Sequence, residues 1–169
     1  MAIVDNNVLS ALAKIERLAL LPAVFENVGT TTSVVAELDR AEATGYEFVT
    51  RIDAVKSYND GWLEVCSPTE SELELADEIR DHALSATDAQ CLAIASRRDR
   101  RLVTDDAHVG TIGRQREVNV WDLPLCLTAA IRIGAIGSVD ELSEIVESLR
   151  REDGYRFSTA DEEALFEEF

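Results

Sequence analysis

The chain has 169 residues, 46% of them apolar, and three prolines, a composition that can bury one sizeable core and makes a single domain the default. No apolar run approaches the roughly 18 residues of a membrane span, and the start MAIVDNN lacks the basic region and cleavage site of a secretory signal, so we expect a cytoplasmic protein without a membrane partner. The formal net charge of −17, from 33 acidic and 16 basic residues, would ordinarily repel a nucleic acid.

The first part of the chain alternates strand and helix patterns. Short apolar runs predict strands at residues 2–4, 28–31 and 62–65. Apolar residues at helical spacing predict a helix over 8–21 that is stopped near Pro22, and a second over 33–44 that ends at Gly45. This alternation is typical of βα units and a mainly parallel sheet.

Two helices and two further strands are predicted in the middle of the chain. Thr69 and Glu72 fit a capping box at the start of a helix that includes Ile79, and Ser85 caps a helix over 86–98. Strands follow at 102–104 and 118–121, which gives five predicted strands in all.

The last part of the chain is predicted to be helical and then polar. Helices are expected over 124–136, ended by Gly137, and over 138–150, where Ser138 and Glu141 fit another capping box. From residue 152 the chain is polar, with a few apolar residues: Tyr155, Phe157, Leu165, Phe166 and Phe169. We therefore expect one domain over residues 1–150, followed by an acidic C-terminal tail or docked helix over 151–169.

Carboxylates stand directly after two of the predicted strands. Asp5 follows the first strand, and Asp105 and Asp106 follow the fourth. In an open α/β sheet the functional crevice lies beyond the carboxyl ends of the strands, where the strand order reverses. The alternative is that these residues only cap helices, the commonest use of Asp at such a turn, although Asn6 and Asn7 could cap the first helix equally well.

Glu37 and Asp88 are two further candidates, each early in a helix that follows a hydroxyl-bearing stretch. An acidic residue in that position is also favoured by the helix dipole. Neither residue decides the question alone.

Four runs of the sequence contain these acids: IVDNNVLSALAKI, SVVAELDRA, LSATDAQCLAIAS and LVTDDAHV. Together they resemble the four acidic motifs of PIN-domain nucleases, in the order of that family and at plausible spacings. The resemblance covers roughly residues 1–137, and the run VNVWDLPLCLTAAIRIGAI is similar to the end of VapC-like PIN proteins. It implies a single α/β domain with a parallel five-stranded sheet in the order 3-2-1-4-5, flanked by helices.

The resemblance also assigns roles to individual residues. Metal-binding and catalytic roles fall on four acids: Asp5, Glu37, Asp88 and Asp106. Asn7 and Thr104 become residues that orient these ligands, and Asp105 an outer group, because the family's fourth acid usually stands two positions after the Thr. The chain departs from the family pattern at Asn6, where a hydroxyl residue is common, and at Ala107 and His108, where a basic residue often follows the last acid.

Electrostatics explains why such a pocket needs a cation. Two carboxylates 4 Å apart repel by about 4 kcal/mol at an effective dielectric near 20, so four converging ones need protons or cations to neutralise them. Mg²⁺ or Mn²⁺ is the expected cofactor, and such an ion activates water for attack on a phosphodiester. The resemblance implies a metal-dependent endoribonuclease that leaves 3′-hydroxyl and 5′-phosphate ends.

The acidity of the chain does not exclude RNA as the substrate. Lys14 and Lys56 are the only lysines, and the acids are spread along the whole chain, a pattern that resembles cytoplasmic proteins of halophilic, salt-accumulating archaea. At molar salt the Debye length is about 3 Å, so a negative surface hardly opposes a polyanion. On charge alone, an acidic protein with no nucleic-acid partner is the alternative.

The arginines offer only a few candidates for RNA binding. Arg114 and Arg116 follow the acidic pair and are the candidate RNA contacts, whereas Arg97 and Arg98 fit the end of a helix, where the dipole favours cations.

Other chemistries find little support. Cys66, Cys91 and Cys126 form no CxxC pair and are expected in the core, and neither His82 nor His108 accompanies a nucleophile motif. Response-regulator receivers and haloacid-dehalogenase phosphatases both need a late Lys, and the lysines here are early.

Several biological roles fit the predicted nuclease. One is the toxin of a toxin-antitoxin pair, held inactive by a small antitoxin protein. The alternatives are RNA processing by a PIN-like nuclease without a toxin role, and a non-catalytic PIN-like module that binds RNA or protein. The apolar late helix also predicts a homodimer.

Overall fold

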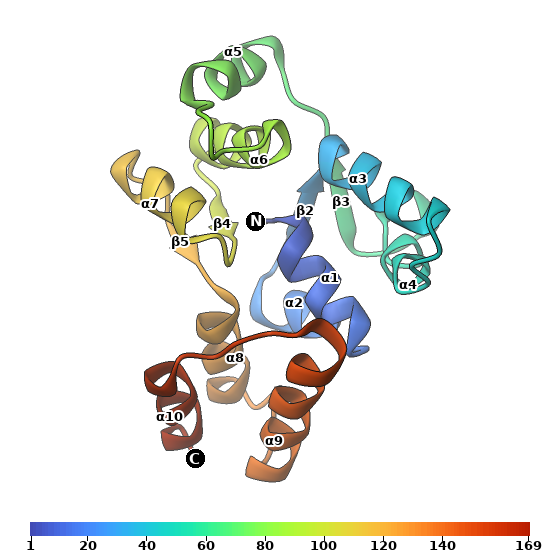
Figure 1. Ribbon diagram of the computed structural model, residues 1–169, viewed down its shortest axis with the longest axis vertical. Helices are drawn as coiled ribbons and strands as arrows, with labels where there is room; N and C mark the ends of the chain where they lie inside the picture. Colours follow the sequence, from blue (N-terminus) through green and yellow to red (C-terminus); the bar gives the residue numbers. More distant parts are fainter.

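Five short parallel strands form one sheet in the computed structural model, which describes all residues from 1 to 169. The strand order is β3-β2-β1-β4-β5 (Figure 1), as the family resemblance implied. The strands are β1 (Ala2–Val4), β2 (Val28–Thr31), β3 (Leu63–Cys66), β4 (Arg101–Val103) and β5 (Val120–Trp121).

Helices surround this sheet and form most of the chain. The first six are α1 (Asn6–Lys14), α2 (Leu20–Val24), α3 (Thr32–Ala43), α4 (Val49–Asp53), α5 (Glu70–Ile79) and α6 (Ala86–Arg97). The last four are α7 (Ala107–Gln115), α8 (Leu123–Arg132), α9 (Val139–Ser148) and α10 (Thr159–Glu167). A 3₁₀ turn, η1 (Ser57–Asn59), and a π-helical turn, η2 (Leu149–Asp153), complete the structure. No helix is long and apolar enough to cross a membrane.

β1 and β4 are neighbours in the sheet, and their carboxyl ends lie level with each other. Ile3 pairs with Leu102 and Val4 with Val103, and all four side chains are buried, as expected for parallel strands covered on both faces. The strand order reverses between β1 and β4. The residues that follow these two strands therefore emerge side by side at the reversal point.

The helix predicted over residues 8–21 is wrong in extent, because the chain breaks it into two. α1 ends at Lys14, and Glu16 adopts a left-handed backbone with φ of 60°, which an α-helix does not accept. Pro22 lies inside the short α2 rather than stopping a helix. It is tolerated there because the N–H groups of the first helical turn have no intrahelical partner.

α7, between β4 and β5, was not predicted from the sequence. Its residues include Gly110 and Gly113, which have low helix propensity. The structure shows why Gly113 is used: an added Cβ would come 2.7 Å from Cγ2 of Val120. Gly113 thus lets α7 pack closely against β5. The same glycine makes the helix hard to recognise in the sequence.

The C-terminal elements differ from the predicted ones in their bounds. α8 ends at Arg132 and is followed by Gly134 with φ of 76°, so Gly134 rather than Gly137 ends this helix. α9 is continued by the π turn η2 up to Asp153. Residues after it form α10, which packs on α8 through buried Leu165. All three cysteines are free and buried, as predicted.

Candidate active site

Asp5 has two oxygens in different environments at the end of β1. Its Oδ1 accepts a hydrogen bond of 2.9 Å from the Val8 backbone N–H and so caps α1. Its Oδ2 is buried and has no hydrogen-bond partner, in a residue that is only 2% exposed. Burial raises the pKa of Asp5 to about 7, against the lowering effect of the nearby Thr104 hydroxyl. Capping therefore explains one oxygen of this carboxylate and leaves the other without a partner.

Asp106 follows β4 and stands beside this position. Its Oδ1 accepts hydrogen bonds from the backbone N–H groups of His108 (2.8 Å) and Val109 (3.0 Å), so it caps α7. The Thr104 hydroxyl accepts a 3.2 Å hydrogen bond from the Asp106 backbone N–H. Thr104 is buried and so holds this turn in a fixed position, leaving Oδ2 of Asp106 free of hydrogen bonds from the chain.

Asp105 makes different contacts from its neighbour. Its Oδ1 accepts a 2.9 Å hydrogen bond from the Leu123 backbone N–H and a 3.1 Å hydrogen bond from the Tyr155 hydroxyl. Burial raises the pKa of Asp105 above its ordinary value. Asp105 thus ties the end of β4 to the start of α8 and to the C-terminal segment, while its charge also acts on Asp5 and raises the pKa of that group.

Glu37 and Asp88 come from α3 and α6 and are held by neutral side chains. Oε2 of Glu37 accepts a 3.0 Å hydrogen bond from Asn6 Nδ2, and its Oε1 accepts a 2.5 Å hydrogen bond from the Thr87 hydroxyl. Oδ2 of Asp88 accepts a 2.6 Å hydrogen bond from Ser85. Burial raises the pKa of Asp88, and so do the charges of Asp106 and Glu37. These acids are close enough to perturb one another.

The acidic crevice, defined by Asp5, Glu37, Asp88 and Asp106, contains no cation from the chain. None of the ten ion pairs in the structure includes any of these residues. No three of them are arranged as ligands of one ion. Mg²⁺ uses one or two carboxylates directly and keeps several waters. The unpartnered oxygen of Asp5, together with carboxylates at longer range, therefore fits a hydrated divalent ion.

The side chain that links α1 to Glu37 is that of Asn6, the neighbour of the predicted residue Asn7. Asn7 is exposed and its side chain makes no hydrogen bond, whereas Asn6 bridges α1 to Glu37. Thr87 does the same from α6. Both residues stand next to a predicted acid in the sequence, which is the one signal that could have indicated them.

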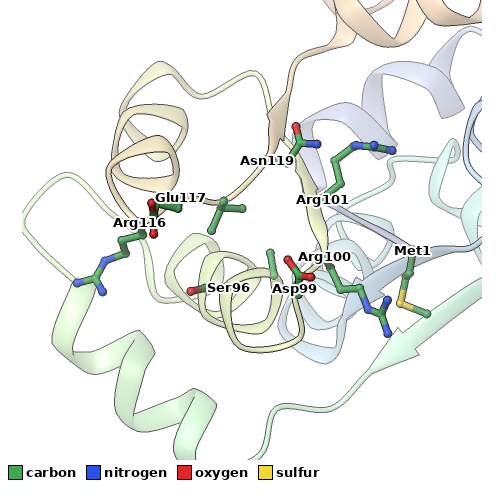
Figure 2. Close-up of a pocket in the computed structure, with 10 residues that line it drawn as sticks. Met1, Ser96, Asp99, Arg100, Arg101, Arg116, Glu117 and Asn119 are labelled. Atoms are coloured by element: carbon green, nitrogen blue, oxygen red, sulfur yellow. The ribbon is translucent and has the colours of Figure 1, made fainter.

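The structure does not bring Arg114 and Arg116 to the acidic crevice. α7 runs back from Asp106, and its nine residues span about 13 Å at the helical rise of 1.5 Å per residue. The Arg114 guanidinium folds back beside Gly110 and lines a hollow with Asp122 and Pro124. Arg116 lines a hollow of about 290 Å³ at the amino ends of the strands, together with Met1 and Asn119 (Figure 2). His108, by contrast, lies next to the crevice and contacts Asp81 at 2.9 Å.

The comparisons with known proteins agree with this arrangement. Residues 1–167 match the family described as DUF3368, a PIN domain. A comparison with curated proteins finds no match. The matched range includes all four acids of the crevice and continues through α10.

Proposed function

Because the chain belongs to the PIN-domain family, whose fold is that of a nuclease, we propose that the acidic crevice is the active site of a divalent-metal-dependent ribonuclease. Its substrate is RNA and its reaction is hydrolysis of an internal phosphodiester bond. Mg²⁺ or Mn²⁺ is the proposed cofactor.

One observation carries the proposal: four carboxylates meet at the reversal point of the sheet without a Lys or Arg partner, and Oδ2 of Asp5 is buried without a hydrogen bond within 3.5 Å. Buried charges are ordinarily paired or coordinate a metal. The chain has 16 cations and uses none of them here. This arrangement destabilises the metal-free protein and is best explained by a ligand of opposite charge.

The residues of the crevice have separate roles in this proposal. Asp5, with its free Oδ2, and Asp106, with its free Oδ2, are the direct ligands, and Glu37 and Asp88 hold the ion's waters. Thr104 keeps the turn before Asp106 in place. Asn7 remains a predicted orienting residue at the entrance, and Asp105 an outer group. The bound ion would polarise a water for in-line attack on the phosphate and stabilise the leaving oxygen.

The test is cleavage of RNA by purified protein in molar KCl. We expect cleavage with Mg²⁺ or Mn²⁺ and none with a chelator. Asp5→Asn, Asp88→Asn and Asp106→Asn each keep the shape and remove one charge, so each should lower turnover by roughly 100-fold or more.

A matched control is Asp99→Asn, at the amino ends of the strands. Asp99 has φ of 50°, a conformation that Asn accepts as readily as Asp, so this change removes the same charge without strain. Full activity is expected. Full activity in the three crevice variants as well would refute the proposed function.

The proposed biological role is the toxin of a toxin-antitoxin pair, with a small antitoxin protein as partner. The support is the likeness of the run VNVWDLPLCLTAAIRIGAI to the end of VapC-like PIN proteins. Expression of the chain alone should arrest growth, and expression of Asp5→Asn should not. Unaffected growth in both cases would leave RNA processing as the role.

A homodimer is proposed through α8. Leu125 and Ile133 expose large apolar side chains at this helix, and Val139 does so at the start of α9. Light scattering in molar KCl should give twice the mass of one chain, and a monomer mass would refute this part of the proposal. The high salt follows from our further proposal that the protein works in a salt-rich cytoplasm, supported by its net charge of −17.

A further inference from the structure

A hollow of about 360 Å³ lies between α1, α3 and the turn that precedes α4. Figure 1 shows α1, α3 and α4 next to one another, and η2 contacts α1. We call it the Tyr46 hollow; its lining includes Asn6, Asn7, Ser10, Lys14, Tyr46 and Phe48. Its volume lies at the lower end of the roughly 300–1,000 Å³ of small-molecule sites.

One residue, Asn6, links the Tyr46 hollow to the acidic crevice. Asn6 lines the hollow and donates from Nδ2 to Glu37, one of the four acids. Its Oδ1 accepts a 2.9 Å hydrogen bond from Ser10, which also lines the hollow. In a phosphate-linked polymer with one phosphate over the acids, the neighbouring monomer would therefore reach the hollow.

Tyr46 is held in a fixed position although its ring is uncovered. The Tyr46 N–H donates to the Ala41 carbonyl at 3.2 Å and the Gly45 N–H to the Glu42 carbonyl at 2.8 Å. With Gly45 at φ of 100°, these bonds form the Schellman turn that ends α3. The side chain of Tyr46 is nevertheless 57% exposed. A rigid backbone thus presents an aromatic ring to solvent.

Phe48 supports this ring from the side. The Tyr46 and Phe48 rings meet edge to face, with centroids 6.0 Å apart. Lys14 Nζ lies 5.2 Å from the centroid of Phe48. An edge-to-face pair covers at most one face of Tyr46, so at least the other face is available for a flat partner.

The charges in the hollow indicate what kind of ligand it takes. Lys14 is the one cation in the lining, and it forms a 2.7 Å ion pair with Asp153. No excess positive charge remains for a phosphate. An exposed ring, the amide groups of Asn6 and Asn7 and a small volume suit an uncharged, planar group with polar edges.

We propose that the Tyr46 hollow binds an unstacked nucleobase of the RNA substrate, with Tyr46 as the residue on which the base stacks. This inference rests on the proposed function, because the acidic crevice positions the neighbouring phosphate. Aromatic rings stack on bases of any kind. Molar salt screens ionic contacts with RNA, so stacking is the contact best preserved under the proposed working conditions.

The experiment uses a short single-stranded RNA that carries 5-iodouridine, a base that crosslinks under ultraviolet light to an aromatic side chain stacked on it. Wild-type protein with Mg²⁺ in molar KCl should crosslink at Tyr46, as located by mass spectrometry of the peptides. In parallel, Tyr46→Ala should raise the KM for RNA cleavage by about 10-fold, with kcat within about twofold of wild type because the acids are untouched. Tyr46→Phe keeps the ring and should retain the wild-type KM.

Tyr58→Ala is the matched control. Tyr58 is 64% exposed and, like Phe48, has a lysine near its ring, with Lys56 Nζ 5.7 Å from the centroid. It lies outside the Tyr46 hollow and the crevice. Its removal should change neither crosslinking nor KM.

The outcomes separate this inference from the proposed function. Cleavage by wild type with an unchanged KM in Tyr46→Ala, or a crosslink located elsewhere, overturns the nucleobase site alone. An unchanged KM together with a loss of dimer mass in Tyr46→Ala overturns it in favour of a protein interface. Absence of metal-dependent cleavage by wild type overturns the proposed function, and a missing crosslink in that case overturns both.

Discussion

The carboxyl ends and the amino ends of the strands, here called the carboxyl edge and the amino edge, differ in whether charged side chains lack a partner. At the carboxyl edge, four acids meet without a cation, and Oδ2 of Asp5 is buried without a partner. At the amino edge, three arginines line the hollow of about 290 Å³, but Figure 2 shows Arg100, Arg101 and Arg116 pointing in different directions. The guanidinium of Arg101 instead lies over Trp121, 4.4 Å from the ring centroid. A functional site is indicated by desolvated charge without a partner, more than by a cavity or a count of charges.

Helix polarity explains why acids and arginines separate in this way. Each helix that follows a parallel strand starts at the carboxyl edge, where its positive dipole end favours acids. Asp5 and Asp106 cap such helices, and Asp88 lies in the first turn of another. α6 and α7 carry Arg97 and Arg114 in their last turns, although the Arg114 guanidinium folds back beside Gly110. Helix capping and metal binding are therefore compatible uses of the same carboxylates.

The largest expected effect distinguishes two adjacent acids of the carboxyl edge. Asp106→Asn should lower turnover by roughly 100-fold or more, whereas Asp105→Asn should lower it by less than about 10-fold. The reason is that Oδ1 of Asp105 is used by Leu123 and Tyr155, bonds that an Asn oxygen can also accept. Single-turnover cleavage with saturating Mg²⁺ measures both.

The reverse order of these two variants would make Asp105 the fourth ligand. It would leave the contrast between the two edges intact. Equal and full activity in both would remove Asp105 and Asp106 from the chemistry altogether.

The positions of the candidate site residues were easier to predict from the sequence than the contacts that hold them. Five strands and the positions of Asp5 and Asp106 at strand ends could be predicted because alternation and strand ends are local features. The strand order came from the likeness of the acidic runs to a family. α7 escaped prediction because Gly113 serves packing against β5 and weakens the helical pattern.

Contacts between distant residues could not be predicted from one sequence. Tyr155 donates to Asp105 from 50 positions away, and Lys14 pairs with Asp153 across 139. No local pattern marks either pair. Asn6 looked like a departure from the family motif, and its bond to Glu37 became visible only when α1 and α3 were placed side by side.

Away from the four acids we expect a substitution to affect stability and leave catalysis unchanged. Glu72 is 3% exposed and accepts hydrogen bonds from Arg98 at 2.7 and 2.9 Å. Arg98→Ala leaves this buried carboxylate unpaired and should lower the free energy of unfolding by about 2 kcal/mol at pH 7. Turnover per folded molecule should not change. Chemical denaturation is the measurement, and Arg97→Ala, next in sequence and without an ion pair, should change stability by less than about 0.5 kcal/mol.

The effect of Arg98→Ala should depend on pH in a defined direction. The Arg98 hydrogen bonds lower the pKa of Glu72 to about 2, below its ordinary value of 4.5. The pair therefore stabilises the fold fully above pH 4.5 and loses this contribution as the pH falls toward 2. The difference between wild type and Arg98→Ala should shrink over that range. A difference that stays constant would mean that the arginine acts through packing alone.

A smaller and opposite effect is expected for Asp5→Asn in chelator-treated protein. Burial raises the pKa of Asp5 from 3.8 to about 7, so the stability of the metal-free fold falls as the pH rises from about 4 to about 7, and the loss is complete above 7. Asn keeps the oxygen that caps α1 and removes the charge, which should raise stability by about 1 kcal/mol at pH 8. Asp122→Asn is the control, because Asp122 also caps a helix but lies exposed, and no gain is expected there. A loss of stability in Asp5→Asn would mean that Asp5 is only a cap.

The smallest expected effect concerns Arg114 and Arg116, which were predicted to contact RNA and lie at the far end of α7 from Asp106. A single strand that starts over the acids must follow about 13 Å of helix to meet Arg116, and about one helical turn less to meet the Arg114 guanidinium, which folds back beside Gly110. Alanine substitution of either should therefore raise KM by less than about threefold in molar KCl, where screening weakens phosphate contacts. The increase should appear only with RNA long enough to extend past α7, and should grow as the salt is lowered. Cleavage assays with a trinucleotide and with a longer RNA, each at two salt concentrations, separate the cases. An equal effect on the trinucleotide would mean that the arginines reach the acidic crevice itself. The placement of acids and arginines at opposite edges of the sheet would then hold only for the metal-free protein.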